Sequence, residues 1–311
     1  MRMSSMPKKI LYNFVIFLIS IFAISTITFF LFELVPGNIY DPDLIKSEQI
    51  VLNIREKYGL DENISTRYLR MLKNTFSFDF GNSFIYDGIS VNGIIAKYFP
   101  ISAILGSISL LASFIAGIFI SCASSKSRGA RNIFFIIIVL FISLPIFVIA
   151  ALLQYFFCVK FRIFPVLWSA NWTNFILPSI ALSIYPTTFI SRLLSISIAE
   201  IKQMDYVIAA RARGINTITI WLSYILKNAV TPVISYIGPL FASMLTGSFV
   251  VETIFNIPGL GRYFINSINN RDYPVVMGLT LFYAIILIST NFIANVLISI
   301  NDYKGKITEN R

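Results

Sequence analysis

The chain has 311 residues, of which 56% are hydrophobic and only 13% are charged, whereas soluble domains usually carry about 25% charged residues. This composition excludes a soluble globular protein and indicates a membrane protein. The net charge of +10 comes from 25 Lys and Arg against 15 Asp and Glu, but the basic residues form short clusters between long apolar runs, so we expect no nucleic-acid partner. The chain has no His, which excludes His-dependent proton relays, catalysis and metal sites, and we expect no cofactor.

Six stretches without any Asp, Glu, Lys or Arg are long enough to cross a bilayer, which takes about 20 helical residues. They predict an all-α integral membrane protein with six transmembrane helices and the lipid bilayer as a partner. The stretches are Ile10 to Phe32, Tyr98 to Ser125, Asn132 to Val159, Ile163 to Ser191, Asn228 to Val251 and Tyr273 to Asn301.

The distribution of Lys and Arg predicts the orientation, because basic residues of short loops are retained in the cytoplasm. Basic clusters precede the first stretch, fill the loop after the second and recur between the fourth and the fifth. Both termini are therefore predicted to be cytoplasmic, and residues 33–97 to be extracytoplasmic. A helix-like pattern from Ile50 to Tyr58 suggests a small folded element in that segment.

Small residues recur at four-residue spacing in two of the stretches, on one face of each predicted helix. Such faces allow close helix approach, and they also suit a pathway or a subunit interface, so both interpretations stay open. The residues are Ser109, Ser113, Gly117 and Ser121 in the second stretch, and Ala242 and Thr246 in the fifth.

The cytoplasmic segment Arg192 to Lys227 contains a predicted short helix. Asp205 is the expected N-cap and Gly214 the expected terminator. The small side chains of Ala209 and Ala210, flanked by Arg211 and Arg213, suit insertion into a groove of another protein; the alternative is a helix held on anionic lipid.

The loop between the fifth and sixth stretches is rich in turn-forming residues. Pro258, Gly259 and Gly261 predict a tight turn. The charged side chains that follow are expected near the outer mouth, where they meet a binding partner or the substrate, or else satisfy one another within the loop. They are Arg262, Arg271 and Asp272.

The predicted spans contain no ionisable residue, although ion-coupled carriers usually keep one at mid-membrane depth. The chain also lacks a G-x-x-x-x-G-K-[ST] phosphate loop and is not expected to bind nucleotide. The energy for transport is therefore expected from a separate subunit that hydrolyses nucleotide.

These features resemble the permease subunits of ATP-binding-cassette (ABC) importers, whose coupling loop carries Glu-Ala-Ala, three residues and Gly. Ala209, Ala210 and Gly214 match that pattern, while Ile208 replaces the Glu, as in the peptide-importing branch. The likeness to B-type permeases of oligopeptide or dipeptide importers extends over almost the whole chain. Its other segments are Leu34–Gly37, Arg55–Leu60, Asp79–Ser83, Asp205–Val207, Val251–Phe255, Pro258–Arg262 and Arg271–Val275.

The resemblance implies the ABC type-1 (type I importer) permease fold, with an extracytoplasmic segment between helices 1 and 2. Its domains would be residues 1–32 (cytoplasmic N-terminus and first helix), 33–97 (extracytoplasmic), 98–301 (transmembrane domain with coupling loop 192–227) and 302–311 (cytoplasmic tail). Coupling would involve Asp205, Ala209, Ala210, Arg211, Arg213 and Gly214.

The resemblance also implies partners and a location. The partners are a second permease in a heterodimer, two ABC ATPases, an extracytoplasmic substrate-binding protein and a peptide substrate, in a bacterial cytoplasmic membrane. The chain itself would be a transport subunit with no catalytic residues. Nickel or another small solute remains an alternative cargo within the same framework, and an ion-coupled carrier or membrane enzyme is a distant alternative.

Overall fold

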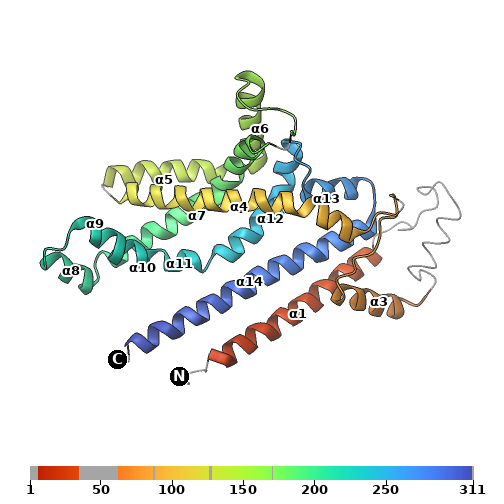
Figure 1. Ribbon diagram of the computed structural model, residues 1–311, viewed down its shortest axis with the longest axis horizontal. Helices are drawn as coiled ribbons and strands as arrows, with labels where there is room; N and C mark the ends of the chain where they lie inside the picture. The colour runs from red at the N-terminus through yellow and green to blue at the C-terminus, as the bar shows by residue number, and fades with distance from the viewer. Residues whose placement is uncertain (1–5, 35–61, 87, 126–127, 170, 310–311) are drawn as a thin grey trace. The chain divides into compact units, whose positions relative to one another are not determined.

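A computed structural model describes residues 6–34, 62–86, 88–125, 128–169 and 171–309 (Figure 1). Over these residues the chain is helical, apart from turns and one isolated β-bridge between Asn82 and Ser90. This confirms the all-α prediction. The predicted element Ile50 to Tyr58 and the matching segment Arg55–Leu60 lie outside the described residues.

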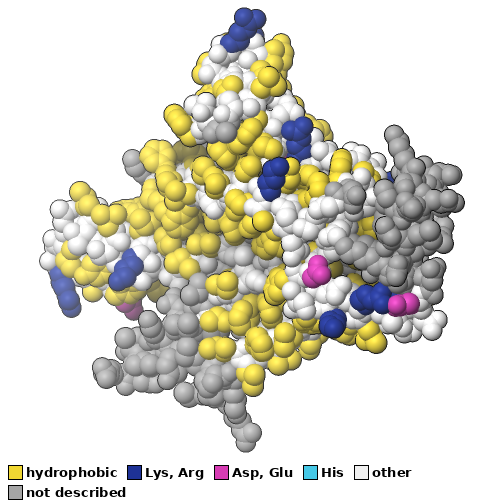
Figure 2. Space-filling model, turned by 45° about the vertical axis from the view of Figure 1, so that its right-hand side comes forward, with side chains coloured by type: hydrophobic (Ala, Val, Ile, Leu, Met, Phe, Trp, Pro, Cys, Tyr) yellow, Lys and Arg dark blue, Asp and Glu magenta, His cyan; other side chains and the backbone are white. Residues whose placement is uncertain are grey.

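Five described helical segments are long and apolar enough to cross a membrane, and six if the bent helix α12 (Ile237–Ile254) counts as one span. Hydrophobic side chains cover much of the surface that Figure 2 shows, as expected for helices that face lipid. The five segments are Ile10–Glu33 of α1 (Met6–Glu33), α4 (Val91–Ser124), α7 (Thr173–Ile201), Thr217–Ile234, and Tyr273–Val296 of α14 (Tyr273–Glu309).

The third predicted stretch, Asn132 to Val159, is not a single helix, and its interior Pro145 predicts such a shorter or kinked helix. It divides into α5 (Arg128–Ser143), α6 (Ile146–Leu153) and the π-helix η2 (Gln154–Lys160). Pro145 is the N-cap of α6, and because proline has no amide hydrogen it cannot continue the hydrogen bonding of α5. Figure 1 shows α6 leaving the direction of α5 after this break.

Part of the predicted cytoplasmic segment is apolar enough to span a membrane by length and composition. Thr217–Ile234 combines α9 (Thr217–Thr219), the π-helix η3 (Ile220–Leu226), α10 (Lys227–Ala229) and α11 (Thr231–Ile234). The sequence predicts only its second half as part of a span, because Lys227 interrupts the uncharged run.

The chain forms two compact units. Unit 1 contains Met1–Ser102 and Pro258–Phe292, and unit 2 contains Ala103–Ile257 and Ile293–Arg311. Unit 1 includes α3 (Ile64–Phe76) and α13 (Leu260–Asn269) beside α1 and the first parts of α4 and α14.

A buried carboxylate holds two distant segments of unit 1 together. Asp272 is 1% exposed and accepts hydrogen bonds from the Ser83 hydroxyl (2.5 Å) and the Phe84 amide (3.1 Å). Burial raises the pKa of the Asp272 carboxyl, while these hydrogen bonds act in the opposite direction. Elsewhere in unit 1, the Ser102 hydroxyl accepts a hydrogen bond from the Leu260 amide (2.9 Å) at the start of α13.

The small residues of α4 pack against α7 within unit 2. The side chains of Ser109, Ser113 and Ser121 are fully buried, and the Ser113 hydroxyl donates to the carbonyl oxygen of Ser183 on α7 (3.1 Å). A Cβ atom on Gly117 would lie 2.6 Å from the Ile190 Cγ2 atom, so the two helices are in close contact at this glycine. The stripe therefore serves close helix packing inside the chain.

We expect Gly117→Val to destabilise unit 2 by about 1–3 kcal/mol, because the added side chain would overlap Ile190. Thermal unfolding of the purified protein in detergent measures this. The control Ser107→Val changes an exposed position of the same helix and should leave the midpoint unchanged. Equal midpoints for both variants would contradict the packing assignment.

Replacing Asp272 tests the buried carboxylate. Asp272→Ala leaves the Ser83 hydroxyl and the Phe84 amide without their acceptor and should cost about 1–3 kcal/mol. Asp272→Asn keeps an acceptor oxygen and should cost less.

The pH dependence of Asp272 has a definite sign. Because its pKa is raised in the folded state, the folded protein binds the proton more tightly, and this group's contribution to stability falls as pH rises from about 3.9 through the folded pKa. Unfolding of wild type and Asp272→Asn between pH 4 and 8 should show this fall only in the wild type. Parallel profiles would disprove it.

Candidate functional site

Helix α8 (Asp205–Ala212) confirms the predicted short helix and corrects its start. Its N-cap is Met204, with extended backbone angles, so Asp205 occupies the first helical turn and is not the cap. A carboxylate there still interacts favourably with the helix dipole. The predicted end is correct: Gly214 has a φ of +72°, the left-handed conformation that glycine adopts without strain.

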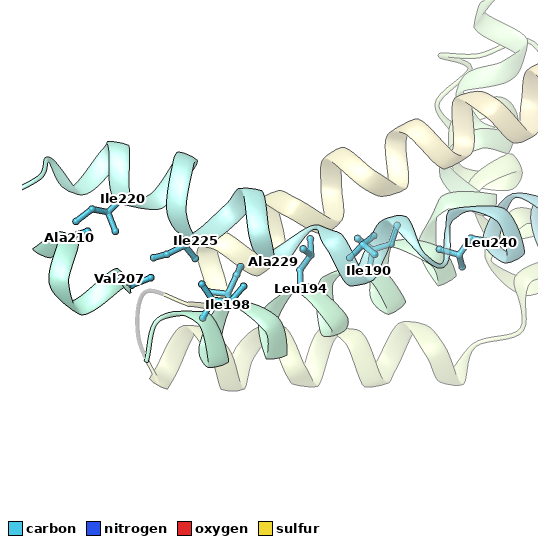
Figure 3. Close-up of a cluster of buried hydrophobic side chains, with 11 residues drawn as sticks. Ile190, Leu194, Ile198, Val207, Ala210, Ile220, Ile225, Ala229 and Leu240 are labelled. Carbon is cyan, nitrogen blue, oxygen red and sulfur yellow. The ribbon is translucent and has the colours of Figure 1, made fainter. Parts of the chain in front are cut away.

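One side of α8 packs onto the core of unit 2. Val207 is fully buried and Ala210 is 4% exposed, and their three-residue spacing places them on the same side of the helix. They belong to a cluster with Ile198 of α7 and with Ile220 and Ile225 of η3 (Figure 3). Figure 1 shows α8 and α9 beyond the end of α7, on the opposite side of unit 2 from α6.

The two alanines of the predicted motif therefore have different surroundings. Ala209 is exposed, whereas Ala210 faces Val207 and the isoleucines of the chain's own core. The expectation that both are small because of a partner's groove is wrong for Ala210. Its small size is explained by the close packing of α8 on α7 and η3.

The opposite side of α8 is exposed. We call it the outward face and define it by Asp205, Ile208, Ala209 and Ala212, which recur at the spacing of one helix side. Ile208 is 52% exposed, so about half of this apolar residue is left uncovered by the described residues of the chain. Arg211, Arg213 and Gly214 are also exposed, so the face combines a small apolar centre with basic flanks.

Polar contacts hold the flanks of α8. The Tyr206 hydroxyl accepts a hydrogen bond from the Asn228 side-chain amide (3.1 Å). The Lys202 ammonium lies 4.9 Å from the centre of the Trp221 ring and donates to the Ser125 carbonyl oxygen (3.4 Å). Burial lowers the pKa of Lys202, and the positive charge of Arg211 lowers it further.

Sequence reasoning missed these contacts and the buried side of α8. The three-residue spacing of Val207 and Ala210 is a signal that could have indicated the buried side. The pairs Tyr206 with Asn228 and Lys202 with Trp221 join residues about twenty positions apart, and no local pattern marks them.

The predicted loop after α12 has a different geometry. Gly259 is the N-cap of α13 with a negative φ, and Gly261 is buried in its first turn, so Pro258 leads into a helix and not into a glycine-dependent tight turn. The left-handed backbone lies at Asn256 and Arg271, with φ of 55° and 58°.

The charged residues of that loop separate into two kinds. Asp272 is buried and accepts hydrogen bonds from Ser83 and Phe84 of the 79–84 segment, so it is not presented to a partner. Arg271 is exposed and Arg262 is partly exposed, so these two remain candidates for an external contact.

The remaining predicted positions belong to α12. Ala242 is 2% exposed and packs inside unit 2, while the Thr246 side chain lies outside the described part of the structure. A pathway role for Ala242 and Thr246 stays a prediction.

A family model for the binding-protein-dependent transport system inner membrane component matches residues 110–304. The chain is 37% identical to the dipeptide transport system permease protein DppB of Bacillus subtilis (strain 168), over 93% of this chain and 94% of that protein. It is 33% identical to the DppB protein of Lactococcus lactis subsp. cremoris (strain MG1363), over 97% and 100% of the two chains. The oligopeptide transport system permease protein OppB of Salmonella typhimurium is 34% identical over 84% of this chain and 87% of its own length.

A crystal structure of an amino acid ABC transporter with histidines has a similar fold. It superposes with a TM-score of 0.52 at 17% identity, over 67% of this chain and 94% of that one. The fold and the sequence relatives thus agree with the resemblance carried by Ala209, Ala210 and Gly214. The chain therefore belongs to the family of binding-protein-dependent transport system inner membrane components, as a multi-pass permease with the ABC importer fold.

Proposed function

We propose that this chain is the permease subunit of an ATP-driven importer that translocates peptides delivered by an extracytoplasmic binding protein. The observation that carries the proposal is the 37% identity to a dipeptide permease over 93% of the chain, joined by oligopeptide permeases at similar identity. The names of these relatives favour peptides over nickel or another small solute.

The proposed assembly contains a second permease and two ABC ATPases, and ATP hydrolysis takes place on the ATPases. The loop 192–227 is the coupling loop, and the outward face of α8 docks into a groove of an ATPase. Ile208 and Ala209 supply the apolar centre of that contact, with Arg211 and Arg213 at its rim.

The inner side of α8 explains how an ATPase could act on the membrane helices. Val207 and Ala210 pack on Ile198 and Ile225, so a displacement of α8 is passed to α7 and η3. The π-helix η3 begins eight residues after α8 ends, and π-helical segments often mark functional positions. ATP binding would then shift the equilibrium between two conformations of the permease, because the two conformations make different contacts with α8.

The proposed orientation counts α5 to η2 as the third crossing and Thr217–Ile234 together with α12 as the fifth. It places both termini, the tail 302–311 and the coupling loop in the cytoplasm of a bacterial inner membrane. Residues 33–97 then lie outside, where the binding protein arrives, with Arg262 and Arg271 near the same side. The support is the distribution of basic residues in the loops.

The direct test of function is peptide uptake by cells or proteoliposomes that contain this chain together with the second permease, the two ATPases and the binding protein of the proposed assembly. We expect ATP-dependent accumulation of a labelled dipeptide or short oligopeptide, and no accumulation without this chain. Nickel uptake with no peptide uptake would overturn the peptide assignment and leave the permease fold intact.

Ala209→Glu and Ala210→Glu separate the two sides of α8. Ala209→Glu leaves the core untouched but places a charge in the docking contact, so ATPase co-purification and peptide uptake should fall by at least about tenfold. Ala210→Glu buries an unpaired charge among isoleucines and should lower the folded yield of the permease itself.

The matched control for the outward face is Arg213→Gln, which removes a rim charge and should change co-purification less. Wild-type co-purification and uptake in Ala209→Glu would show that the outward face docks no ATPase. The helix would then be a membrane-surface element.

Single cysteines test the orientation, in a background where Cys122 and Cys158 are replaced by Ala. Asn63→Cys, before α3, and Arg213→Cys, at the C-cap of α8, are both exposed positions. A membrane-impermeant thiol reagent added to intact cells should label the first and spare the second. Labelling of both would disprove the proposed topology.

A further inference from the structure

Unit 1 contains a cavity of about 120 Å³ that the proposed function does not use. Its walls come from the end of α1, from α3, from the 79–84 segment and from the start of α14. Most of the lining is apolar and includes Phe29, Phe32, Met71, Phe84, Met277 and Leu281. The polar side chains are Glu33, Arg67, Arg70, Asn74 and Asp79, and we call them the polar end because Glu33 and its ion-pair partner Arg67 lie at the end of the α1 span.

Each of the two arginines at the polar end has a hydrogen-bond donor atom that its ion pair does not use. Arg67 forms an ion pair with Glu33 through Nη2, and the Arg70 Nη2 atom contacts both carboxylate oxygens of Glu62 at 2.6 and 2.7 Å. The Arg67 Nε and Arg70 Nη1 atoms are nevertheless buried without a hydrogen-bond partner in the described structure. Buried donors of this kind normally have an acceptor, so these two point to a ligand with anionic oxygens.

The spacing of the arginines suits one ligand. Arg67 and Arg70 are three residues apart on α3 and so lie on the same helix side. Guanidinium groups present planar sets of donors that match a phosphate better than a single point charge does. The carboxylates of Glu33 and Asp79 also line the cavity and would repel a small free anion. This favours a ligand that also makes apolar contacts in the rest of the cavity.

The place of the cavity along the chain identifies the source of such a ligand. The α1 span ends at Glu33 and the α14 span begins at Tyr273, and both residues line the cavity. The polar end therefore lies where spans meet the aqueous boundary, the depth of phospholipid headgroups. Phe29, Phe32 and Leu281 lie within the spans, which the acyl chains of the bilayer surround.

We propose that this cavity binds one glycerophospholipid. Its phosphodiester oxygens accept hydrogen bonds from Arg67 Nε and Arg70 Nη1, and the first methylenes of one acyl chain lie along Phe29, Phe32 and Leu281. The bound lipid thereby joins α3 to the outer ends of α1 and α14. A peptide fits this cavity less well than a lipid. A ligand that occupies the cavity beside the α1 and α14 spans needs a long apolar part as well as an anionic group.

The test uses the full-length permease in its purified complex, stripped of lipid in detergent and titrated with short-chain phosphatidylglycerol. Native mass spectrometry counts the bound lipids. The double variant Arg67→Gln, Arg70→Gln should weaken the tightest lipid site by at least about tenfold. The matched control Lys73→Gln removes a charge from an exposed position of α3 outside the cavity and should change binding by less than about twofold.

Two further arms test the apolar part and the competing ligands. Met277→Trp fills the cavity without changing its charges and should also weaken the tight site, with the melting temperature measured to verify folding. Inorganic phosphate and a dipeptide should not displace the lipid at comparable concentration.

Equal lipid binding by the double variant and the wild type would overturn the proposal. So would displacement of the lipid by inorganic phosphate or by the dipeptide, which would assign the cavity to a free anion or to the transported substrate.

Discussion

The burial of Val207 and Ala210 against α7 and η3 is the contact on which the functional account depends. It makes α8 part of the core of unit 2, although the helix is only eight residues long. A helix of that length is not stable alone in water, so tertiary packing must hold it. The same contact determines which side of α8 faces outward, because a side that is buried in the chain's own core cannot also contact a partner protein.

This two-sided arrangement assigns separate roles to neighbouring small residues. Ala210 must be small for α8 to approach the isoleucines of its own chain, while Ala209 is small on a surface that the chain leaves open. Gly214 then allows the chain to turn back towards η3 through a left-handed conformation. A docked ATPase would therefore contact Ile208 and Ala209 and act on α7 through Val207 and Ala210.

Sequence periodicity and charge predicted the helical class, most of the membrane spans and the short helix α8, because these depend on local composition. The third stretch is divided because Pro145 breaks a run that hydrophobicity alone treats as continuous. Only the second half of Thr217–Ile234 was predicted to lie in a span, because Lys227 ends the uncharged run of the fifth stretch.

The candidate site was predicted less completely than the fold. The motif located α8, but it did not distinguish Ala209 from Ala210, because burial depends on where α7 and η3 run. Asp272 was expected either to meet a partner or to be satisfied within its own loop, and it is engaged instead by Ser83 and Phe84, nearly 190 residues earlier in the chain. Such pairings need the three-dimensional structure, since nothing in the local sequence encodes the partner.

The most direct test of the two-sided α8 is thiol accessibility in the permease with and without its ATPases, again without Cys122 and Cys158. Ile208→Cys should react rapidly with a thiol reagent applied from the cytoplasmic side and become protected when the ATPases bind. Ala210→Cys should react slowly in both conditions, because its side is covered by the chain's own core. Rapid reaction of Ala210→Cys, or unchanged reactivity of Ile208→Cys on addition of the ATPases, would contradict the account.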